Sequence, residues 1–393
     1  MKHIIIGNGV AGTSAALTIR KQDAAADILI LSAEPTPFYS RIRLIDYLSG
    51  EVSAQDLILF KDSWYEKNAV ALRLSTPALR IDPKTKTVEI AGGQPLCYDR
   101  LLLATGGVPS LPPIQGIHLP CVYTLRTLAD AERIRDAAER SQNVLVLGGG
   151  LLGIETAHAL RKAGHPVTVV EYFPRLLPRQ MDAAGGAVLQ RALENRGLRF
   201  VLDAKTRTIV DDAGRRGIEL LDGRFVAGDM IIVSAGIAPN RALLNGLPVD
   251  QSRGVPVNDL LETGLPDVYA AGDLVEHRGV MYGIWPAAER QGKIAGTNMA
   301  GGRELYTGTL PSNVLKVAGI DLMSAGNIDA DSRYRSVVET DADKGIYRKL
   351  VLDGDTLVGC ILCGSTEGKK NILNAIQEKK PLQSVADAIG RKE

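Results

Sequence analysis

The chain is poor in aromatic residues and has no long apolar run. Only five of its 393 residues are Phe and two are Trp. This scarcity argues against single-strand nucleic-acid binding, which depends on aromatic side chains that stack with bases. Lys and Arg together number 46 and Asp and Glu together number 45, so no excess charge attracts nucleic acid or an anionic membrane. Because no run of about eighteen apolar residues occurs, we expect no membrane-spanning segment.

Cysteine is also scarce. The four cysteines are spread along the chain, at Cys97, Cys121, Cys360 and Cys363. They are too few and too scattered for a disulfide scaffold. No basic segment followed by an apolar stretch and a cleavage site opens the sequence, so we expect no signal peptide. These features predict a cytoplasmic protein with reduced thiols, and the length predicts two or three domains.

A glycine-rich turn lies near the start of the sequence, in "HIIIGNGVAG". The apolar run Ile4–Ile6 is typical of a buried parallel strand, and residues Ala11–Ile19 suit a helix. Between the strand and the helix stand three glycines at the spacing G-x-G-x-x-G: Gly7, Gly9 and Gly12. In this context the motif predicts a dinucleotide site with the pyrophosphate at the helix N-terminus. Glu34 ends the next strand and can accept the hydroxyl groups of a ribose. The alternative is a turn that only connects elements, with Glu34 solvated.

The same pattern returns in "NVLVLGGGLLGIETAHALRKAGHPVTVVEY". Its glycines are Gly148, Gly150 and Gly153. The helix predicted over Leu151–Lys162 is followed by Gly164, a good residue to close a helix. The next strand ends in Glu171, and an acid at this place favours a free 2′-hydroxyl over a 2′-phosphate. We therefore expect NADH to be preferred over NADPH, although Arg175 lies close enough to weaken that preference.

Each turn is followed by a later strand that ends in glycine, so the two turns are not halves of one site. "RLLLATGG" ends on Ala104, Thr105 and Gly106, "DMIIVSAGIAPN" contains Gly236, and "PDVYAAGDL" places Asp273 after Gly272. The sequence therefore predicts an α/β protein with two Rossmann-like dinucleotide-binding domains and two ligands.

These ordered signatures resemble the pyridine nucleotide–disulfide oxidoreductase-like flavoproteins. The similarity is greatest to NAD(P)H:rubredoxin reductases and to the flavin-binding part of NADH-dependent nitrite reductases. It implies that the first turn binds FAD and that the second binds NADH, or NADPH in its place. It also implies a discontinuous FAD-binding domain (1–108 and 245–305), an NAD(P)H-binding domain (109–244) and a small α+β C-terminal interface domain (306–393).

The resemblance also implies site residues, and no metal. For FAD they lie in the first turn and in the later signatures: Gly7, Gly9, Val10, Ala11, Gly12, Glu34, Arg41, Leu79, Ala104, Thr105, Gly106, Gly272, Asp273 and Trp285. For NAD they lie in and after the second turn: Gly148, Gly150, Leu151, Leu152, Gly153, Glu155, Glu171 and Gly236. Trp285 is expected near the flavin and Glu155 near the nicotinamide. The alternatives are an aromatic core residue and a solvated carboxylate beside the helix dipole. Arg41 is preferred to Arg43 as a contact to FAD.

The placing of the cysteines separates this chain from disulfide reductases of the same superfamily. The stretch "EPTPFYSRIRLIDYLSGE", where such enzymes carry a redox-active cysteine, has none. It resembles rubredoxin reductases, and Asp46 stands where ferredoxin-reductase-like relatives have a lysine. Cys360 lies on a predicted strand, Leu357–Leu362, and Cys363 follows it directly; along a strand, side chains three apart point to opposite faces. We therefore expect two buried thiols rather than a disulfide or half of a metal site. No second Cys/His pair completes a zinc or iron–sulfur site.

The C-terminal part has the pattern of a small sheet with one helix. Asp353 and Gly354 predict a hairpin turn between two strands, and "STEGKKNILNAIQEKKPL" predicts the helix. Four lysines make that helix basic: Lys369, Lys370, Lys379 and Lys380. An acidic electron carrier can dock there, although a solvated helix face explains the lysines equally well. Whether this part forms a homodimer or joins a larger complex stays open.

Without a thiol relay, electrons must leave the flavin directly. The main prediction is an enzyme, an FAD-dependent NAD(P)H:acceptor oxidoreductase. Hydride passes from NADH to FAD, and electrons then pass to an iron–sulfur carrier such as rubredoxin or a ferredoxin-like protein. Two alternatives remain: a peroxide-forming NADH oxidase, and a flavin- and NAD-binding subunit of a larger redox complex or a redox sensor. Neither nucleic acid nor a membrane is expected as a partner.

Overall fold

The computed structural model describes residues 1–385 except 213, 251–252, 311 and 342. By its packing the chain forms two compact units. The first unit contains Met1–Arg41, Ser53–Val108 and Ile237–Thr309. The second unit contains Ile42–Val52, Pro109–Gly236 and the described residues from Leu310 onward. The division into three domains drawn from the sequence stays a prediction.

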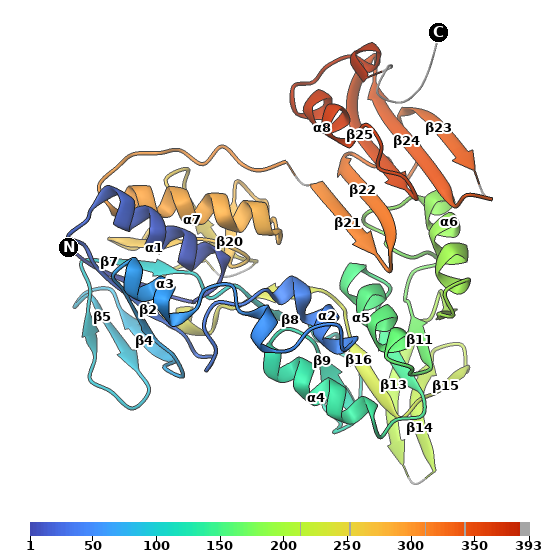
Figure 1. Cartoon of the computed structure of the whole chain (residues 1–393), viewed down its shortest axis with the longest axis horizontal. Coiled ribbons are helices and arrows are strands. Elements are labelled where there is room, and N and C mark those ends of the chain that lie inside the picture. Colours follow the sequence, from blue (N-terminus) through green and yellow to red (C-terminus); the bar gives the residue numbers. More distant parts are fainter. Residues whose placement is uncertain (213, 251–252, 311, 342, 386–393) are drawn as a thin grey trace. The chain divides into compact units, whose positions relative to one another are not determined.

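A five-stranded parallel sheet forms the centre of the first unit (Figure 1). Its order is β19-β7-β1-β2-β3, with bounds Val268–Ala270, Arg100–Leu103, Lys2–Ile6, Asp27–Leu31 and Val70–Arg73. The central strand β1 pairs on both sides, with Ile4 opposite Leu29 of β2 and Leu101 of β7. Residues Ile4–Ile6 are buried, as predicted, because a central parallel strand is covered on both faces.

Two helices pack together beside this sheet. α1 (Val10–Gln22) follows the first glycine turn directly. α7 (Trp285–Met299) carries Pro286 in its first turn, where proline is well tolerated.

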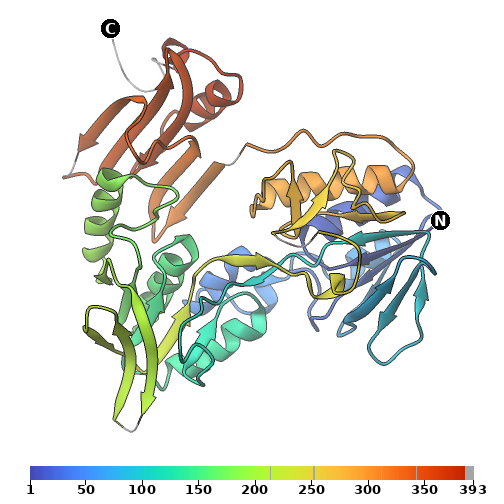
Figure 2. The ribbon, with the colours of Figure 1, turned by 180° about the vertical axis from the view of Figure 1, so that it is seen from behind.

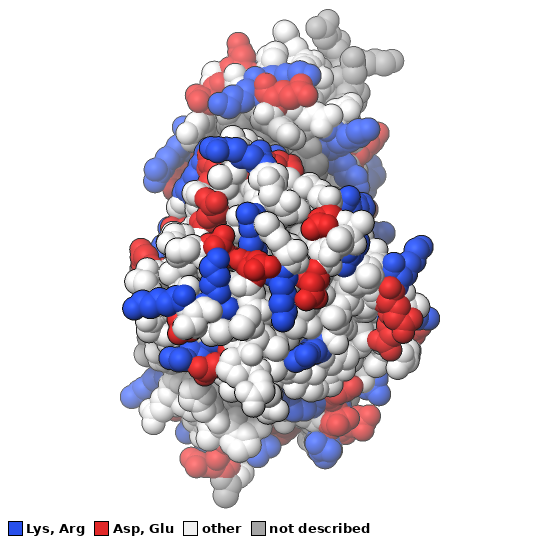
Figure 3. All heavy atoms as spheres, turned by 90° about the vertical axis from the view of Figure 1, so that its left-hand side faces the viewer, with Lys and Arg blue, Asp and Glu red and all other residues white. Residues whose placement is uncertain are grey.

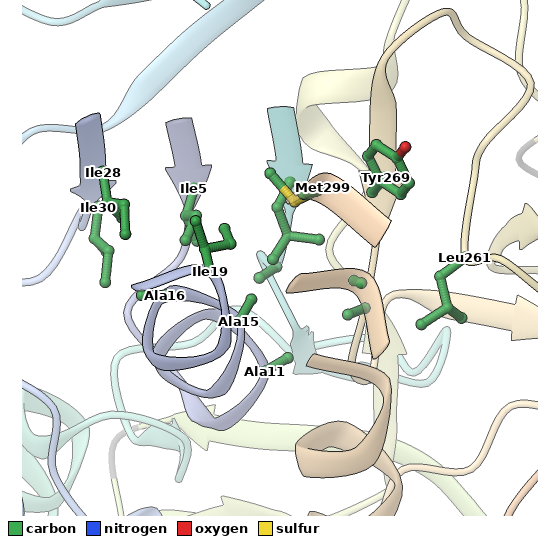
Figure 4. Packing of buried hydrophobic residues seen from close by; sticks show 14 of the residues in the cluster. Ile5, Ala11, Ala15, Ala16, Ile19, Ile28, Ile30, Leu261, Tyr269 and Met299 are labelled. Carbon is green, nitrogen blue, oxygen red and sulfur yellow. The ribbon is translucent and has the colours of Figure 1, made fainter. Parts of the chain in front are cut away.

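Glycines in α7 let the two helix backbones approach closely. A Cβ added at Gly292 would lie 2.3 Å from the carbonyl oxygen of Ala11, and one at Gly296 would lie 2.7 Å from that of Ala15. Figure 4 shows both alanines on the side of α1 next to α7, while Ile19 points to the sheet. The small residues thus fix where the N-terminal ends of α1 and α7 lie in this unit.

The other elements of the first unit are short. β4 (Ala78–Asp82), β5 (Thr87–Ile90) and β6 (Leu96–Cys97) form an antiparallel sheet, β18 (Val255–Val257) pairs with β20 (Val275–His277), and α3 covers Asp62–Lys67. Short 3-10 helices cover Gln55–Leu57 and Ala242–Leu244, and a third, Arg41–Arg43, crosses from the first unit into the second.

On the face that Figure 3 displays, basic and acidic side chains are interspersed, in keeping with the formal net charge of +1.

A second parallel sheet forms part of the second unit and is seen from behind in Figure 2. Its order is β12-β11-β10-β16-β9, with bounds Arg199–Val201, Val167–Val170, Val144–Leu147, Met230–Val233 and Val122–Thr124. The helices of this part are α4 (Leu128–Ala138), α5 (Leu151–Lys162) and α6 (Ala183–Glu194). α5 has the predicted bounds. The short helix α2 (Leu44–Leu48) packs against α4 and α5.

Two smaller groups of strands complete this region. β13 (Thr206–Asp212), β14 (Arg215–Leu220) and β15 (Phe225–Ala227) form an antiparallel sheet. β8 (Gly107–Pro109) pairs with β17 (Ile237–Pro239) where the chain passes between the units.

A five-stranded antiparallel sheet follows within the second unit. Its order is β21-β22-β25-β24-β23, with bounds Ser312–Val317, Ile320–Gly326, Thr356–Cys363, Ile346–Asp353 and Arg335–Asp341. α8 (Lys369–Gln377) packs on it and a 3-10 helix covers Leu382–Val385. β24 and β25 form the predicted hairpin, with Gly354 at a φ of +58° in its turn. No helix in the described ranges is long and apolar enough to cross a membrane.

Buried polar groups join this antiparallel sheet to α6. Asp182 caps α6 by accepting from the Gly185 N–H (2.9 Å) and also accepts from the Tyr347 hydroxyl (2.7 Å). Lys349 is only 3% exposed, and its Nζ lies 3.1 Å from Asp182 Oδ2 and 2.8 Å from the carbonyl oxygen of Asp329. A Cβ at Gly185 would lie 2.9 Å from the Tyr347 ring, so glycine at this place in the helix lets the ring pack against α6.

Candidate dinucleotide sites

The first glycine turn has a backbone that only glycine can form, and its middle glycine faces open space. Gly7 has a φ of +122°, and a Cβ there would lie 2.1 Å from the carbonyl oxygen of Ala104. A Cβ at Gly12 would lie 2.0 Å from the carbonyl oxygen of Gly7. At Gly9 a Cβ would meet no atom within 4 Å. Gly7 and Gly12 therefore serve the fold, and Gly9 leaves room for a ligand at the start of α1.

Asn8, between the first two glycines, has a buried amide that lacks a partner. Its Oδ1 accepts from the hydroxyl of Tyr65 on α3 (3.0 Å), and that hydroxyl accepts from the Phe38 N–H (3.1 Å). Its Nδ2 is buried and has no hydrogen-bond partner among the residues that the structure describes. A buried donor without a partner costs about 1–3 kcal/mol, and a phosphate oxygen at the turn would satisfy it. Sequence reasoning missed Asn8 and Tyr65; the only signal was a polar residue inside the turn.

The acid after β2 is held by side chains. Glu34 has a side chain 27% exposed and accepts from the hydroxyl of Tyr39 (2.6 Å). The Arg41 guanidinium is paired with the same carboxylate and also donates to the Tyr39 hydroxyl (2.9 Å). Arg43 pairs instead with Asp46 of α2 at 3.1 Å. The structure thus brings Arg41, and not Arg43, to Glu34.

Two later signatures of the first unit, around Ala104 and around Gly272, contact the first glycine turn and the start of α1. Ala104 follows β7 directly, and its carbonyl oxygen lies against Gly7. The Thr105 hydroxyl donates to the carbonyl oxygen of Asn240 (2.9 Å). The Gly272 N–H donates to Gln291 of α7 (2.8 Å), and a Cβ at Gly272 would lie 3.3 Å from the Cβ of Ala11. These contacts place Gly272, and with it Asp273, beside the start of α1.

Leu79 stands apart from the glycine turn in its exposure. It lies on β4, where it is 59% exposed. Its role toward FAD stays a prediction from the resemblance.

Both tryptophans lie in one aromatic cluster of the first unit. Both tryptophans and two of the five phenylalanines belong to it, with Tyr65: Phe38, Phe60, Trp64 and Trp285. Trp285 is half-buried, with its ring centre 6.0 Å from that of Phe38. Phe38 and Tyr65 connect the cluster to Asn8, so tryptophan fluorescence is a natural reporter of this turn.

The second glycine turn repeats the geometry of the first. Gly148 also has a φ of +122°, and a Cβ there would lie 2.3 Å from the carbonyl oxygen of Ser234. A Cβ at Gly153 would lie 2.0 Å from the carbonyl oxygen of Gly148. At Gly150 a Cβ would again meet nothing within 4 Å. Leu151 and Leu152 open α5 directly after it, and Leu152 is 38% exposed.

The acid of the second turn is held by the main chain. Glu171 is 5% exposed and accepts from the N–H groups of Gly149 and of Phe173 (2.8 Å for the latter). The Arg175 guanidinium is held in its own loop, where Nε donates to the carbonyl oxygen of Met181 (3.1 Å). Gly236 follows β16 and has a φ of +100°. A Cβ added there would meet no atom within 4 Å.

Glu155 is not the solvated carboxylate of the alternative interpretation. It is the fifth residue of α5, and burial together with the nearby Asp46 of α2 raises its pKa from 4.5 to about 7. On the same helix the Nδ1 atom of His158 is buried without a partner, and Lys162 is paired with Glu51. The start of α5 therefore carries a carboxyl group that holds its proton close to neutral pH.

None of the four thiols is placed as a redox relay. Cys360 and Cys363 are free and fully buried on β25, as predicted, and burial raises their pKa values to about 12 and about 11. Burial also raises the pKa of the Cys121 thiol, which precedes β9. Cys97 is exposed on β6, which pairs with β5 in an antiparallel hairpin. Among the described residues no group of three or more His, Cys, Asp or Glu side chains can hold a metal.

Comparison with known proteins agrees with these two turns and adds the C-terminal part. Residues 1–292 match the family model described as pyridine nucleotide-disulphide oxidoreductase, and residues 311–380 match the rubredoxin NAD+ reductase C-terminal domain. The chain is 34% identical over 98% of its length to "Nitrite reductase [NAD(P)H]" of Bacillus subtilis, of which it covers 48%. The chain thus spans about half the length of that curated relative.

Two further proteins match almost the whole chain. The NADH-rubredoxin oxidoreductase of Clostridium acetobutylicum is 30% identical, over 99% of this chain and 98% of the relative. The solved structure of an NAD-dependent persulfide reductase from A. fulgidus superposes with a TM-score of 0.90 at 27% identity, over 98% of this chain and 78% of that one.

Proposed function

The chain belongs to the pyridine nucleotide–disulphide oxidoreductase family and is an FAD-dependent NAD(P)H oxidoreductase, and from this premise we propose that its electrons pass directly to an iron–sulfur carrier of the rubredoxin or ferredoxin type. The observation that carries the proposal is the state of the thiols. Three of the four are buried with raised pKa values and the fourth lies on an exposed hairpin. A relay through sulfur needs an accessible thiolate, which the three buried thiols do not offer, and in this proposal Cys97 takes no part in the transfer.

The first turn is the FAD site in this proposal. The open side of Gly9 and the N–H groups at the start of α1 would accept the pyrophosphate. The unpaired Nδ2 of Asn8 would donate to the same group. Glu34, held by Arg41 and Tyr39, would accept the ribose hydroxyl groups. When bound, FAD supplies the hydride acceptor, and these residues bind and orient it.

The second turn is the NADH site. Glu171 uses two of its lone pairs on the N–H groups of Gly149 and Phe173 and keeps others for ribose hydroxyls. A 2′-phosphate would bring negative charge against this buried carboxylate. Arg175 donates to loop carbonyls and not outward. Both features support NADH as the preferred reductant.

Glu155 is proposed to lie near the nicotinamide and to keep a proton on its carboxyl group there. The supporting observation is its raised pKa, which burial and Asp46 produce at the start of α5. A neutral carboxyl group can donate one hydrogen bond, for instance to a carboxamide oxygen, which a carboxylate cannot do. Hydride transfer itself needs no acid or base from the chain.

The C-terminal part supplies a surface for the carrier. Lys369, Lys370 and Lys379 are exposed on and after α8, and Lys380 lies 2.5 Å from Glu378. Positive charge on one helix would steer an acidic carrier to this part of the chain. The match of residues 311–380 to the rubredoxin reductase C-terminal domain supports this use.

The test is an anaerobic two-step reaction followed by flavin absorbance. The protein is first reduced with NADH and then mixed with rubredoxin, with a two-iron ferredoxin or with dioxygen. We expect reoxidation by a carrier at least tenfold faster than by dioxygen, falling with added salt. The variant Lys369→Glu with Lys370→Glu should slow the carrier step and leave reduction by NADH unchanged. The matched control Lys316→Glu should change neither step. A fast reaction with dioxygen and no increase in rate with a carrier would establish the peroxide-forming NADH oxidase instead. Negligible turnover in the absence of a copurifying protein would establish the subunit of a larger redox complex.

A further inference from the structure

The outer edge of the C-terminal sheet is a long and regular strand whose outer side is unpaired within the described ranges. β23 ends the order β21-β22-β25-β24-β23 and pairs only with β24 in the described part of the chain. All seven residues of Arg335–Asp341 follow one register, from Arg335 opposite Leu352 to Asp341 opposite Ile346, with no bulge. Figures 1 and 2 both show β23 at the margin of this sheet. Natural proteins usually blunt such an edge with proline, a bulge, a short strand or charged side chains. β23 has no proline and no bulge, and its charges are of both signs: Arg335, Glu339 and Asp341.

The side chains of this edge are exposed or incompletely paired. Val338, at the middle of the strand, is 50% exposed, and Tyr334 just before it is 41% exposed. The Ser336 hydroxyl is buried and has no hydrogen-bond partner. The Arg335 side chain is 67% exposed, and it lies 3.6 Å from the Asp355 carboxylate. An unpaired edge with an exposed apolar centre is a site for strand addition.

The sequence of β23 is complementary to itself when read in the opposite direction. We propose that two copies of this chain pair through β23, antiparallel about a two-fold axis at Val338, so that the two five-stranded sheets become one. In that arrangement Val338 faces its own copy, and Arg335 faces Asp341 of the second copy. Ser336 faces Thr340, so the unpaired Ser336 hydroxyl gains a hydroxyl neighbour. A two-fold axis makes the Arg335–Asp341 pair occur twice, once at each end of the paired strands.

The charges on β23 favour this register over the nearest alternative. Centring the axis on Val337 would pair fewer of the seven residues and leave Arg335 opposite Glu339, which already lies 3.6 Å from Arg348. Strand pairing alone buries less surface than a stable dimer requires. We therefore expect a reversible dimer, with a dissociation constant on the order of micromolar. This proposal is independent of the electron acceptor.

Cysteine cross-linking tests the register directly in the full chain. In a Cys97→Ser background the remaining thiols are buried, so a new cysteine reports alone. Val338→Cys should form a disulfide-linked dimer under mild oxidation, because residues directly opposite have Cα atoms about 5 Å apart. The matched control Val337→Cys should remain monomeric, because the two copies of that residue are offset along the strands. Cross-linking of both variants to the same extent, or of neither, would overturn the proposal.

Charge exchange tests the interface without a cross-link. By sedimentation at several concentrations we expect a monomer–dimer equilibrium for the natural chain. Arg335→Glu should weaken it at least tenfold, because a carboxylate then faces Asp341 at both ends. The double variant Arg335→Glu with Asp341→Arg should return to within about threefold of the natural value. Lys316→Glu on β21, at the opposite edge of the same sheet, is the matched control and should have no effect. A natural chain that is monomeric throughout, or a dimer that Arg335→Glu leaves intact, would contradict the pairing.

Discussion

The two glycine turns share one backbone but hold their acids in different ways. In both turns the first glycine has a φ of +122° and the middle glycine faces open space. In the first, the Glu34 side chain is 27% exposed and is held by the side chains of Tyr39 and Arg41. In the second, Glu171 is 5% exposed and is held by main-chain N–H groups.

One residue in each turn accounts for this difference. The position between the first two glycines is Asn8 in the first turn and Gly149 in the second. A Cβ at Gly149 would lie 3.0 Å from Glu171 Oε2, so only glycine lets the acid fold back onto the turn. In the first turn the Asn8 side chain occupies the turn and is tied to Tyr65. The same fingerprint therefore yields two different environments for a ribose.

The largest effects should come from the glycines that the fold requires. We expect Gly7→Ala and Gly148→Ala to destabilise the chain by about 3 kcal/mol or more, because each Cβ would meet a carbonyl oxygen at a positive φ. Gly9→Ala and Gly150→Ala are the matched controls. They should change the stability of the flavin-free protein by less than about 1 kcal/mol and weaken their own ligand at least tenfold. Thermal unfolding and flavin content measure the two effects; equal destabilisation by all four variants would contradict the comparison.

The acids should separate the two ligands. Glu171→Gln should weaken NADH about 50-fold, since it removes the charge that the N–H groups and the ribose hydroxyls share. Bound flavin should be unaffected. Glu34→Gln should weaken the binding of FAD and leave the affinity for NADH unaffected. Titration of each holoprotein with NADH, and of each flavin-free protein with FAD, gives the dissociation constants. If Glu171→Gln releases flavin and keeps NADH, the two turns are assigned the wrong way round.

The start of the second helix should be sensitive to pH, and the start of the first should not. The two turns align with Ser14 in the place of Glu155. The pKa of Glu155 is raised in the folded chain from 4.5 to about 7 by burial and by Asp46. As pH rises through this window the unfolded chain ionises first, so stability should fall by about 2 kcal/mol between these values and level off above them.

Two variants check the origin of that dependence in thermal unfolding curves taken from pH 4 to pH 8. Glu155→Gln should flatten the fall in stability that belongs to this group. Asp46→Asn should move it to lower pH, because it removes the nearby negative charge. A slope that persists unchanged in Glu155→Gln would show that another group is responsible.

A smaller effect is expected at the position that distinguishes the turns. Asn8→Gly makes the first turn resemble the second and should weaken FAD about tenfold, because the Nδ2 donor is lost. Tyr65→Phe should weaken FAD less, since it removes only the group that orients Asn8. Quenching of tryptophan fluorescence on addition of FAD gives both constants. Asn8→Gly with unchanged affinity would mean that the amide does not contact the ligand.

The smallest effect should come from sulfur. Cys97→Ser removes the one exposed thiol and should leave reduction by NADH and reoxidation by the carrier within about twofold of the natural rates. Stopped-flow absorbance measures both steps. If Cys97→Ser loses either step, a relay through this thiol is required, and the proposed direct transfer of electrons from the flavin to the carrier is wrong.

Local patterns predicted the strands, helices and turns well. The helix after the second turn has the predicted bounds, Leu151–Lys162, because glycines mark both of its ends and its side chains repeat regularly. The hairpin at Gly354 was predicted by the Asp-Gly pair for the same reason. In these cases the residues that decide the structure are neighbours in the sequence.

Contacts between distant residues could not be predicted in this way. Tyr65 orients Asn8 from 57 positions away, and nothing near either residue signals the pair. The raised pKa of Glu155 depends in part on the charge of Asp46 of α2, which the sequence only marked as standing in the place of a lysine. Gly185 is unexplained within its own helix until the Tyr347 ring is seen against it.

The contact between α6 and the antiparallel sheet limits how this chain can be recombined with its relatives. A C-terminal sheet taken from another protein would have to bring a ring and a cation that fit Gly185 and Asp182. A chimera that kept α6 but lost Lys349 would leave an acid inside an apolar interface. Exchange of the C-terminal part should therefore succeed only when the four residues of this contact, Asp182, Gly185, Tyr347 and Lys349, are kept together as a set.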